Sequence, residues 1–230
     1  MKRLLLDQLR AFQQAHRSLA LVTRLADGAQ ALVCCNESRG DLELNLEQLK
    51  QVRQLLLNNR SASLAGEGLF VRSYSPPLRL IIVGAVHISQ LLAPMAALAG
   101  FDVVVVDPRQ AFADAQRFPG TELRAQWPEQ AFTELHPDER TAVVTFTHDP
   151  KIDDPALCAA LQSPAFYVGA LGSRRTHAAR LERLREQVPG ADLTRIHAPI
   201  GLNLGGREPG EIAVAALAQI VEQRNREVMP

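Results

Sequence analysis

The chain has 230 residues, of which 47% are hydrophobic and 22% are charged, as in an ordinary globular protein with a sizeable core. Its 25 Lys and Arg residues balance 25 Asp and Glu residues. Because nucleic-acid-binding proteins normally carry a basic excess, no nucleic-acid partner is expected. The most apolar stretch, residues 80–106, is interrupted by Pro94 and Asp102, so no membrane-spanning helix is expected either.

The first residues do not have the pattern of a secretory signal peptide. The apolar run Leu4–Leu6 is cut off by Asp7, and no small-residue cleavage site follows. A cytoplasmic location is therefore expected. Apolar residues at helical spacing instead predict an amphipathic helix over residues 3–16.

A small α+β module is predicted to follow this helix. Apolar runs at 19–25 and 29–35 flank Asp27-Gly28, which is a strong signal for a two-residue β-hairpin. A second amphipathic helix is predicted over 46–57, and another short strand over 68–74.

A stiff proline pair, Pro76-Pro77, marks the predicted domain boundary. We therefore assign residues 1–75 to the small module and residues 76–230 to a second domain. The three cysteines show no metal-ligand spacing and imply no disulfide framework, so no metal site is expected.

From residue 78 onward, buried strands alternate with helices. Continuous apolar runs at 79–83 and 101–106 are typical of strands covered on both faces of a sheet, and a helix is predicted between them over 87–99. Such alternation implies parallel pairing with right-handed crossovers, so we predict a Rossmann-like α/β sheet flanked by helices, with strand order 3-2-1-4-5. The remaining strands are predicted at 121–124, 141–146 and 165–168.

Ligands of such folds bind outside the carboxyl ends of the strands. The first strand ends in Gly84-Ala85-Val86-His87, where a dinucleotide fingerprint would have G-x-G-x-x-G. Val86 stands at the second glycine position, and its branched side chain occupies the space through which backbone would approach a pyrophosphate. NAD(P) is therefore a doubtful ligand, although the helix N-terminus still offers N–H groups to an anion.

Asp107 ends the second strand, 23 residues after Gly84, close to the offset of a ribose-binding acid. Alternatively, Asp107 is a turn residue before Pro108. Arg109 either neutralises a ligand phosphate or is a solvated surface residue.

The fourth strand ends in Thr147, His148 and Asp149, which favour polar-ligand binding or proton transfer, with helix capping as a second role for Asp149. The fifth leads through Gly169 and Gly172 into Ser173 and Arg174. This segment predicts either a phosphate cradle or a plain turn with a capping serine. The sequence contains no nucleophile elbow, catalytic triad or metal-ligand cluster.

An apolar loop, residues 196–206, contains His197, Gly201 and Asn203 and precedes a helix predicted over 209–224. A loop this apolar is expected to pack over the end of the sheet as a lid or floor.

Taken in order, the segments GAVHIS, VVDPR, FTHD, GALGSRR, HAPIGLNLG and PGEIA resemble the carboxyl-terminal domain of the XdhC/CoxI family over roughly residues 76 to 225. Members of that family are accessory proteins of molybdenum hydroxylases such as xanthine dehydrogenase. The resemblance implies a non-catalytic carrier that binds the molybdenum cofactor (molybdopterin), protects it during sulfuration by a cysteine desulfurase, and hands it to the hydroxylase apoenzyme. A homodimer is left open.

The family motif looks like G-A-G-H, and this chain has Val86 at the second glycine. Two other functions remain open: an NAD(P)-dependent oxidoreductase, and a divergent family member that retains only partner binding. By resemblance, the pocket is lined by Gly84, His87, Asp107, Thr147, His148, Gly172, Ser173, Arg174, His197 and Gly201. The candidate cofactor-binding set also includes Ala85, Val86, Arg109, Asp149, Gly169 and Asn203.

Overall fold

A computed structural model describes residues 3–15, 17–34, 37–57, 59–64, 66 and 68–226. Among the helices in these ranges, none is long and apolar enough to cross a membrane. The chain divides into two compact units, Met1–Pro76 and Pro77–Pro230. Each unit has its own sheet and its own hydrophobic core.

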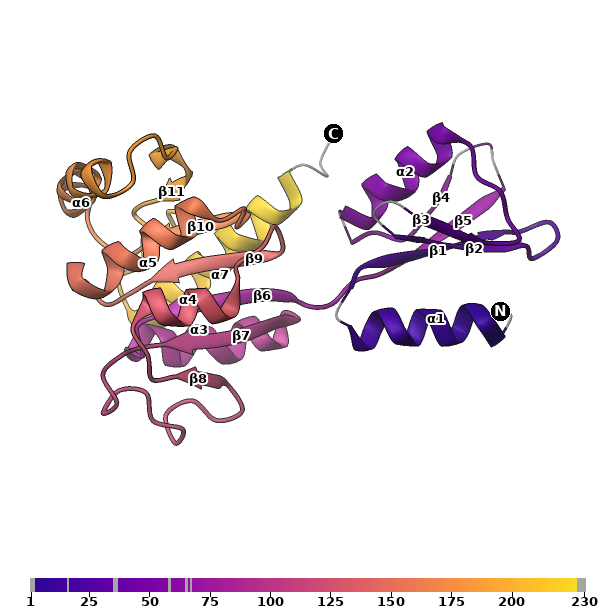
Figure 1. Ribbon diagram of the computed structural model, residues 1–230. Coiled ribbons are helices and arrows are strands. Elements are labelled where there is room, and N and C mark those ends of the chain that lie inside the picture. The colour runs from indigo at the N-terminus through magenta and orange to yellow at the C-terminus, as the bar shows by residue number, and fades with distance from the viewer. Residues whose placement is uncertain are drawn as a thin grey trace. The chain divides into compact units, whose positions relative to one another are not determined.

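The first unit is an antiparallel sheet with one helix on each face (Figure 1). Alternate residues of its strands point to opposite sides, so Val22 and Val33 pack with α2 while Leu21 and Leu32 pack with α1. The strand order is β3-β2-β1-β5-β4. The elements are α1 (Arg3–Gln14), β1 (Leu19–Arg24), β2 (Gln30–Cys34), β3 (Glu37–Gly40), α2 (Leu46–Leu57), β4 (Ala62–Leu64) and β5 (Leu69–Tyr74).

The predicted pairing is confirmed, because β1 and β2 pair antiparallel with Thr23 opposite Gln30, but residues 25–29 connect the strands, so the predicted two-residue turn is wrong. Two strands of this unit were not predicted. All four residues of β3 are exposed and β4 has only three residues, so neither produces an alternating apolar pattern. His16 and Cys35, the last residues of two predicted elements, lie outside the described part of the chain.

The second unit confirms the predicted Rossmann-like α/β sheet. Its strands are all parallel, in the order β11-β10-β9-β6-β7-β8, which is the predicted order with one additional strand beside β10. That strand, β11 (Ile196–His197), was predicted as loop because two residues leave no periodicity. The other elements are β6 (Leu78–Val83), α3 (His87–Leu98), β7 (Phe101–Val106), β8 (Glu122–Arg124), α4 (Pro128–Leu135), β9 (Thr141–Thr145), α5 (Pro150–Gln162), β10 (Tyr167–Ala170), α6 (Arg174–Gln187), a 3₁₀ turn (Leu193–Arg195) and α7 (Pro209–Arg226).

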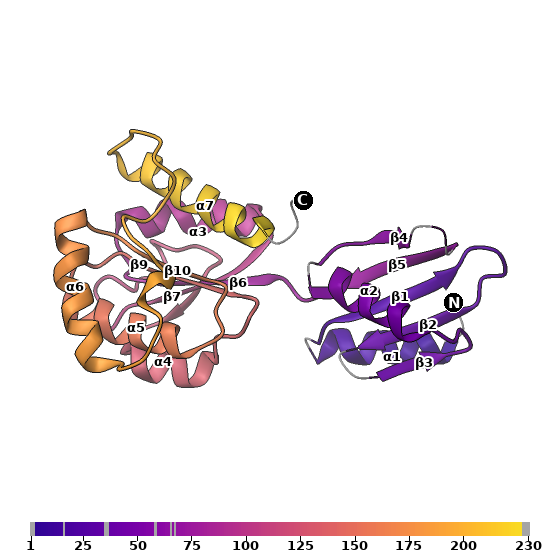
Figure 2. The same ribbon diagram turned by 90° about the horizontal axis from the view of Figure 1, so that it is seen from above.

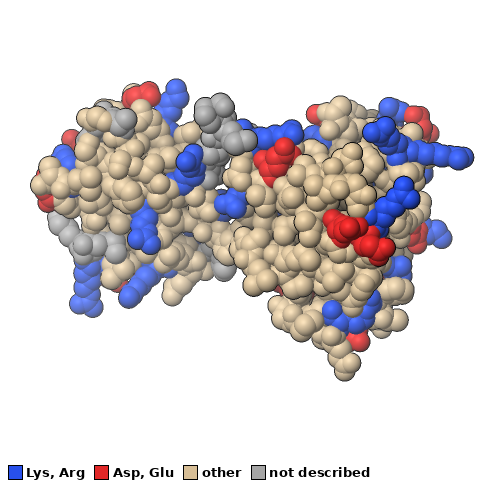
Figure 3. Space-filling model, turned by 180° about the vertical axis from the view of Figure 1, so that it is seen from behind, with Lys and Arg blue, Asp and Glu red and all other residues tan. Residues whose placement is uncertain are grey.

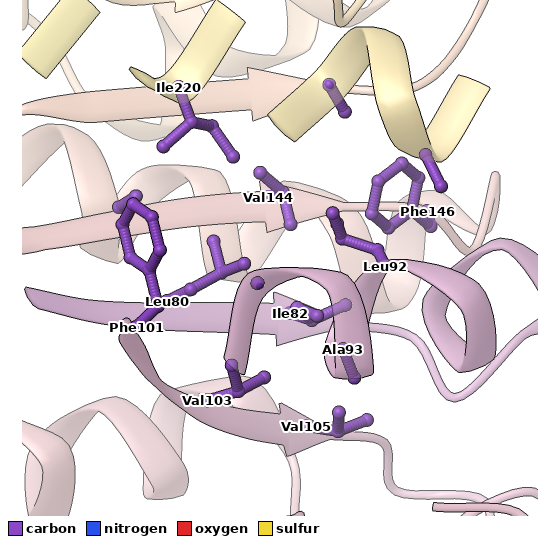
Figure 4. Close-up of a cluster of buried hydrophobic side chains, with 14 of the residues drawn as sticks. Leu80, Ile82, Leu92, Ala93, Phe101, Val103, Val105, Val144, Phe146 and Ile220 are labelled. Atoms are coloured by element: carbon purple, nitrogen blue, oxygen red, sulfur yellow. The ribbon is translucent and has the colours of Figure 1, made fainter. Parts of the chain in front are cut away.

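Helices cover both faces of this sheet, α3 and α7 on one side and α4, α5 and α6 on the other (Figure 2). Leu80 and Ile82 of β6 point toward α3 and α7, where they pack with Leu92 and Ile220 (Figure 4). The intervening Ile81 points to the opposite side. Burial of each such side chain stabilises the fold by about 1.5–3 kcal/mol. Since both faces are closed, a ligand reaches the sheet only at the strand ends.

The outer faces of these helices differ in charge. Helix α3 contains no Asp, Glu, Lys or Arg, whereas the sequence of α6 is dominated by arginine and glutamate. On the α3 side, Leu98 is 91% exposed and Val214 of α7 is 48% exposed. Figure 3 shows the corresponding surface of the second unit, with few charged residues over a wide area.

Candidate functional site

The loops that follow β10, β9, β6 and β7 lie side by side at the carboxyl ends of these neighbouring strands. The strand order reverses between β6 and β9, which is where ligands of open α/β sheets bind. Gly84, after β6, and Thr147, after β9, touch at this point: a Cβ atom on Gly84 would lie 2.6 Å from Thr147 Cγ2. This contact requires glycine at position 84, and so does its φ of 109°, which residues with a side chain rarely adopt.

The loop after β6 begins α3. Val86 occupies the N-cap position with a φ of −94°, a value that any L-residue adopts, so the backbone itself does not demand glycine there. The Val86 side chain is half-buried and packs against the core beneath α3. His87 is exposed, and its Nδ1 lies 3.2 Å from Oε1 of Gln90.

Asp107 joins the loops after β6 and β7. Its carboxylate is fully buried and accepts hydrogen bonds from the N–H of Ala85 (2.8 Å) and from the N–H, Nε and Nη2 of Arg109 (2.9, 2.9 and 2.7 Å). Burial raises the pKa of Asp107, but the hydrogen bonds from Arg109 and Ala85 together hold it below its ordinary value. Four donors occupy the acceptor sites of one carboxylate. These hydrogen bonds favour a structural role for Asp107, which holds the two loops together, over binding of a ribose.

Contacts with Asp107 and Phe112 hold the Arg109 side chain in place. Besides the two side-chain hydrogen bonds to Asp107, its guanidinium lies over the ring of Phe112, 4.3 Å from the ring centroid. The Arg109 side chain remains 35% exposed. It therefore presents a fixed cation at the strand ends.

A buried carboxylate that was not predicted shapes the loop after β9. Asp153, one turn into α5, is 1% exposed and accepts hydrogen bonds from the N–H (3.2 Å) and Oγ1 (2.7 Å) of Thr147 and from the N–H of His148 (3.1 Å). These contacts accompany a φ of 62° at His148, which is uncommon for a residue with a side chain. The His148 side chain is exposed. Asp149 caps α5 by accepting from the N–H of Lys151 (3.0 Å), which confirms its predicted capping role.

Arg180 of α6 connects this loop to the next one. Its side chain is 3% exposed, its Nη2 donates to the Leu171 carbonyl (3.0 Å), and the same atom lies 3.7 Å from Asp153 Oδ2. Burial lowers the pKa of Arg180, opposed by the nearby charge of Asp153. Burial raises the pKa of Asp153, opposed chiefly by the hydrogen bond from Thr147. No sequence pattern indicates this pair, because Arg180 is one of several arginines in α6.

The loop after β10 leads into α6 as predicted. Ser173 is the N-cap, and its Oγ accepts from the N–H of Thr176 (3.1 Å), so the capping interpretation is confirmed. Arg174 and Arg175 form the exposed first residues of the helix. Binding of phosphate by this turn stays a prediction.

Three predicted residues have packing roles on the α7 side of the sheet. The ring of His197 stacks on Tyr167 with centroids 4.7 Å apart, and burial lowers the pKa of His197. A Cβ on Gly169 would come within 2.7 Å of both Tyr167 and Ile200. One on Gly201 would lie 2.9 Å from two atoms of Ala215. These contacts explain the two glycines without a ligand.

The apolar loop packs as expected. The N–H of Ile200 donates to the Ala170 carbonyl (3.1 Å) at the end of β10, and the N–H of Leu202 donates to the Ala215 carbonyl (3.1 Å) in α7. Beyond these anchors, Asn203 is exposed.

Replacing Gly201 with alanine is expected to lower the free energy of unfolding by about 2–4 kcal/mol, because the new Cβ meets Ala215 and the φ of 95° disfavours a side chain. Urea denaturation measures the loss. Gly205 is the matched control, since it has a φ of 79° and nothing within 4 Å of the added Cβ. Its alanine variant should lose only about 1–2 kcal/mol. Equal losses in both variants would show that the contact with Ala215 is not responsible.

A groove of about 510 Å³ lies away from the strand ends, among α4, α5 and α6. Its lining includes Phe132, Cys158 and Gln187 but none of the predicted site residues. Burial raises the pKa of Cys158, whose thiol donates to Gln187 Oε1 (3.3 Å). This thiol is therefore not activated. Within the described ranges, no group of three or more His, Cys, Asp or Glu side chains is arranged to hold a metal ion.

Several known proteins are similar to this chain. "Uncharacterized protein YqeB" of Escherichia coli is 30% identical over 80% of the chain. A probable subunit of xanthine dehydrogenase from Bacillus subtilis and "Molybdenum cofactor insertion chaperone PaoD" of E. coli are each 33% identical, over 69% and 67% of it. The chain spans only 36%, 46% and 43% of the lengths of these three relatives.

A crystal structure described as "a xanthine dehydrogenase (BH1974) from Bacillus halodurans" superposes with a TM-score of 0.77. It is 25% identical, and the match covers 98% of this chain and 68% of that one. The family described as "XdhC Rossmann domain" matches residues 80–220, which is more than half of the chain. The matched residues include all of the strand-end loops described above, and the chain belongs to the XdhC family.

Proposed function

We propose that the chain is an accessory protein that binds the molybdenum cofactor and assists its sulfuration and its insertion into a molybdenum hydroxylase such as xanthine dehydrogenase. One observation carries the proposal: Arg109 and Arg174 are at least partly exposed at the strand ends, while the buried carboxylates there each lie beside an arginine. Asp107 is paired with Arg109 and Asp153 lies beside Arg180. This donor set suits an anionic cargo, and molybdopterin carries a phosphate.

The chain's own residues would hold the cargo. The N–H groups at the start of α6, with Arg174 beside them, would bind the phosphate, while Arg109 would add charge from the neighbouring loop. Thr147 and His148 offer further polar contacts at the point where the strand order reverses. These are binding and orienting roles, so we propose a carrier and not a catalyst.

The proposed partners are a molybdenum hydroxylase apoenzyme and a cysteine desulfurase. The names of two relatives, one a probable part of a xanthine dehydrogenase and the other a molybdenum cofactor insertion chaperone, support the first of these. The desulfurase follows only from the family resemblance. A homodimer and a cytoplasmic location stay expectations.

Cofactor retention tests the proposal. The purified chain is incubated with molybdenum cofactor and passed through a gel-filtration column, and molybdenum and pterin are measured in the protein peak. We expect both to co-elute and to be released to an apo-hydroxylase that gains activity. Absence of both from the protein peak would contradict the carrier function. Binding of the apoenzyme without cofactor would instead indicate a divergent member that retains only partner binding.

Binding of NAD(P)H is expected to be absent or weaker than micromolar. Val86 replaces the second glycine of the dinucleotide fingerprint, and the Asp107 oxygens already accept four hydrogen bonds. Isothermal titration calorimetry with both reduced nucleotides measures this. A micromolar dissociation constant for either one would favour the oxidoreductase alternative. Val86→Gly should strengthen binding of a diphosphate ligand, and an unchanged affinity would disprove the steric argument.

A further inference from the structure

We infer that the first turn of α6 is an anion site for a phosphate monoester and that buried Arg180 supplies its positive charge. The inference rests on the proposed function only for the identity of the cellular ligand. The site itself follows from the geometry of α6 and of the loop before it, and inorganic phosphate tests it directly.

The helix terminus provides the donors. Helix α6 has 14 residues, and the N–H groups of its first turn have no acceptor within the helix. Ser173 satisfies the N–H of Thr176, and the N–H groups of Arg174 and Arg175 have no acceptor among the described residues. The first turn contains no acidic residue to occupy this positive end of the helix dipole.

The buried Arg180 lies beside this helix terminus and has donors to spare. Its side chain is 3% exposed, and its Nε and Nη1 have no hydrogen-bond partner among the described residues. Nη1 points toward the loop, since a Cβ on Gly172 would lie only 3.9 Å from it. A buried cation with unsatisfied donors is costly unless an anion compensates it.

Asp153 compensates Arg180 only in part. It lies 3.7 Å from Nη2, which is longer than a hydrogen bond, and its two oxygens already accept from Thr147 and His148. The Nη1 donor of Arg180 therefore remains unsatisfied beside Gly172, which has no side chain and lies against Thr176. His177, on the same side of α6 as Arg180, adds a buried Nδ1 without a partner among the described residues.

Acidic side chains occupy the N-termini of α5 and α7, whereas the first turn of α6 has none. The start of α7 is occupied by Glu211, whose Oε2 accepts from the N–H groups of Arg207 (2.9 Å) and Glu208 (3.0 Å). Asp149 similarly caps α5. Helix α3 also lacks an acidic first turn, but its cap residue is Val86, and no charged residue lies within the helix. Among these, only α6 combines an open N-terminus with a buried cation.

The test is a titration of the ¹⁵N-labelled chain with sodium phosphate at constant ionic strength, with sodium chloride as the balancing salt. We expect saturable shifts of the backbone amide resonances of residues 172–176. Phenyl phosphate should produce the same shifts, and benzoate should bind more weakly because it has one charge and fewer acceptor oxygens. Absence of saturable shifts at these amides would overturn the inference without any variant.

Arg180→Gln removes the charge and is expected to weaken phosphate binding by about tenfold or more. Arg183→Gln is the matched control, because Arg183 also lies on α6 but donates to both oxygens of a different buried carboxylate, Asp154. The control should bind phosphate like the parent. If Arg180→Gln fails to fold, Arg180→Lys keeps the charge and should lose less than tenfold.

The outcomes separate this site from the proposed function. If Arg180→Gln folds and binds phosphate as tightly as the parent, the anion site is wrong even where the cofactor is retained. If phosphate binds as expected but molybdenum cofactor does not co-elute with the chain, the anion site stands and the proposed function fails.

Discussion

Replacing Asp153 with alanine is expected to lower the free energy of unfolding of the second unit by about 3–5 kcal/mol, because it removes the carboxylate that lies beside the buried Arg180. The same change removes the acceptor for three hydrogen bonds from Thr147 and His148. The loop after β9 then loses the contacts that hold His148 at its positive φ. Urea denaturation followed by tryptophan fluorescence measures the loss, since the single tryptophan, Trp127, reports on this unit.

Asp149 provides the control for this experiment. Asp149 lies only four residues before Asp153, but it caps α5 through one hydrogen bond from the N–H of Lys151, so Asp149→Ala should lose only about 1 kcal/mol. The double variant Asp153→Ala/Arg180→Met, which removes the unpaired charge, should recover part of the stability. If Asp153→Ala loses no more than the Asp149→Ala control, the buried pair does not hold the two loops together.

Arg174→Ala is expected to weaken retention of the molybdenum cofactor by about tenfold to a hundredfold. A charge-assisted hydrogen bond from its guanidinium to the ligand phosphate is worth about 1.5–3 kcal/mol, and about 1.4 kcal/mol corresponds to a factor of ten. Retention is measured as the dissociation constant for the cofactor, or as the fraction of molybdenum that survives gel filtration.

Arg175 is the comparison residue. It is also exposed, but it projects about 100° further around α6, so Arg175→Ala should retain more cofactor than Arg174→Ala. If both variants retain the cofactor as the parent does, the phosphate cradle is wrong and both arginines are surface residues. The stability of both variants should equal that of the parent, because neither side chain is buried.

The architecture of the second unit was predictable because its strands are continuous apolar runs. Residues 79–83 and 101–106 have this pattern, and Gly100 separates the intervening helix from the second strand. Strands without an apolar pattern escaped prediction. In β3 all residues are exposed, and β11 consists of two residues whose pairing with β10 depends on a distant part of the chain.

The candidate site was predictable only in outline. Strand ends can be located from the sequence, so the loops at Gly84, Asp107, Thr147 and Ser173 were found. Partners that meet only in the folded chain could not be found, and Asp153 with Arg180 is the main example.

The same limit applies to glycines. Within the sequence, Gly169 and Gly201 resemble ligand-approach positions, yet their neighbours in space are Tyr167, Ile200 and Ala215. A glycine required by packing and one required by a ligand look the same until those neighbours are known.

The strand order also determines when the binding edge exists during synthesis. The central strand β6 leaves the ribosome before the rest of its sheet, so the sheet grows outward, first through β7 and β8 and then, on the other side, through β9, β10 and β11. The first unit, with its own complete sheet, folds ahead of it. Arg180 and Gln219, which fix the last loops, are translated after β10. A nascent chain therefore lacks part of the proposed binding edge until α7 has been made.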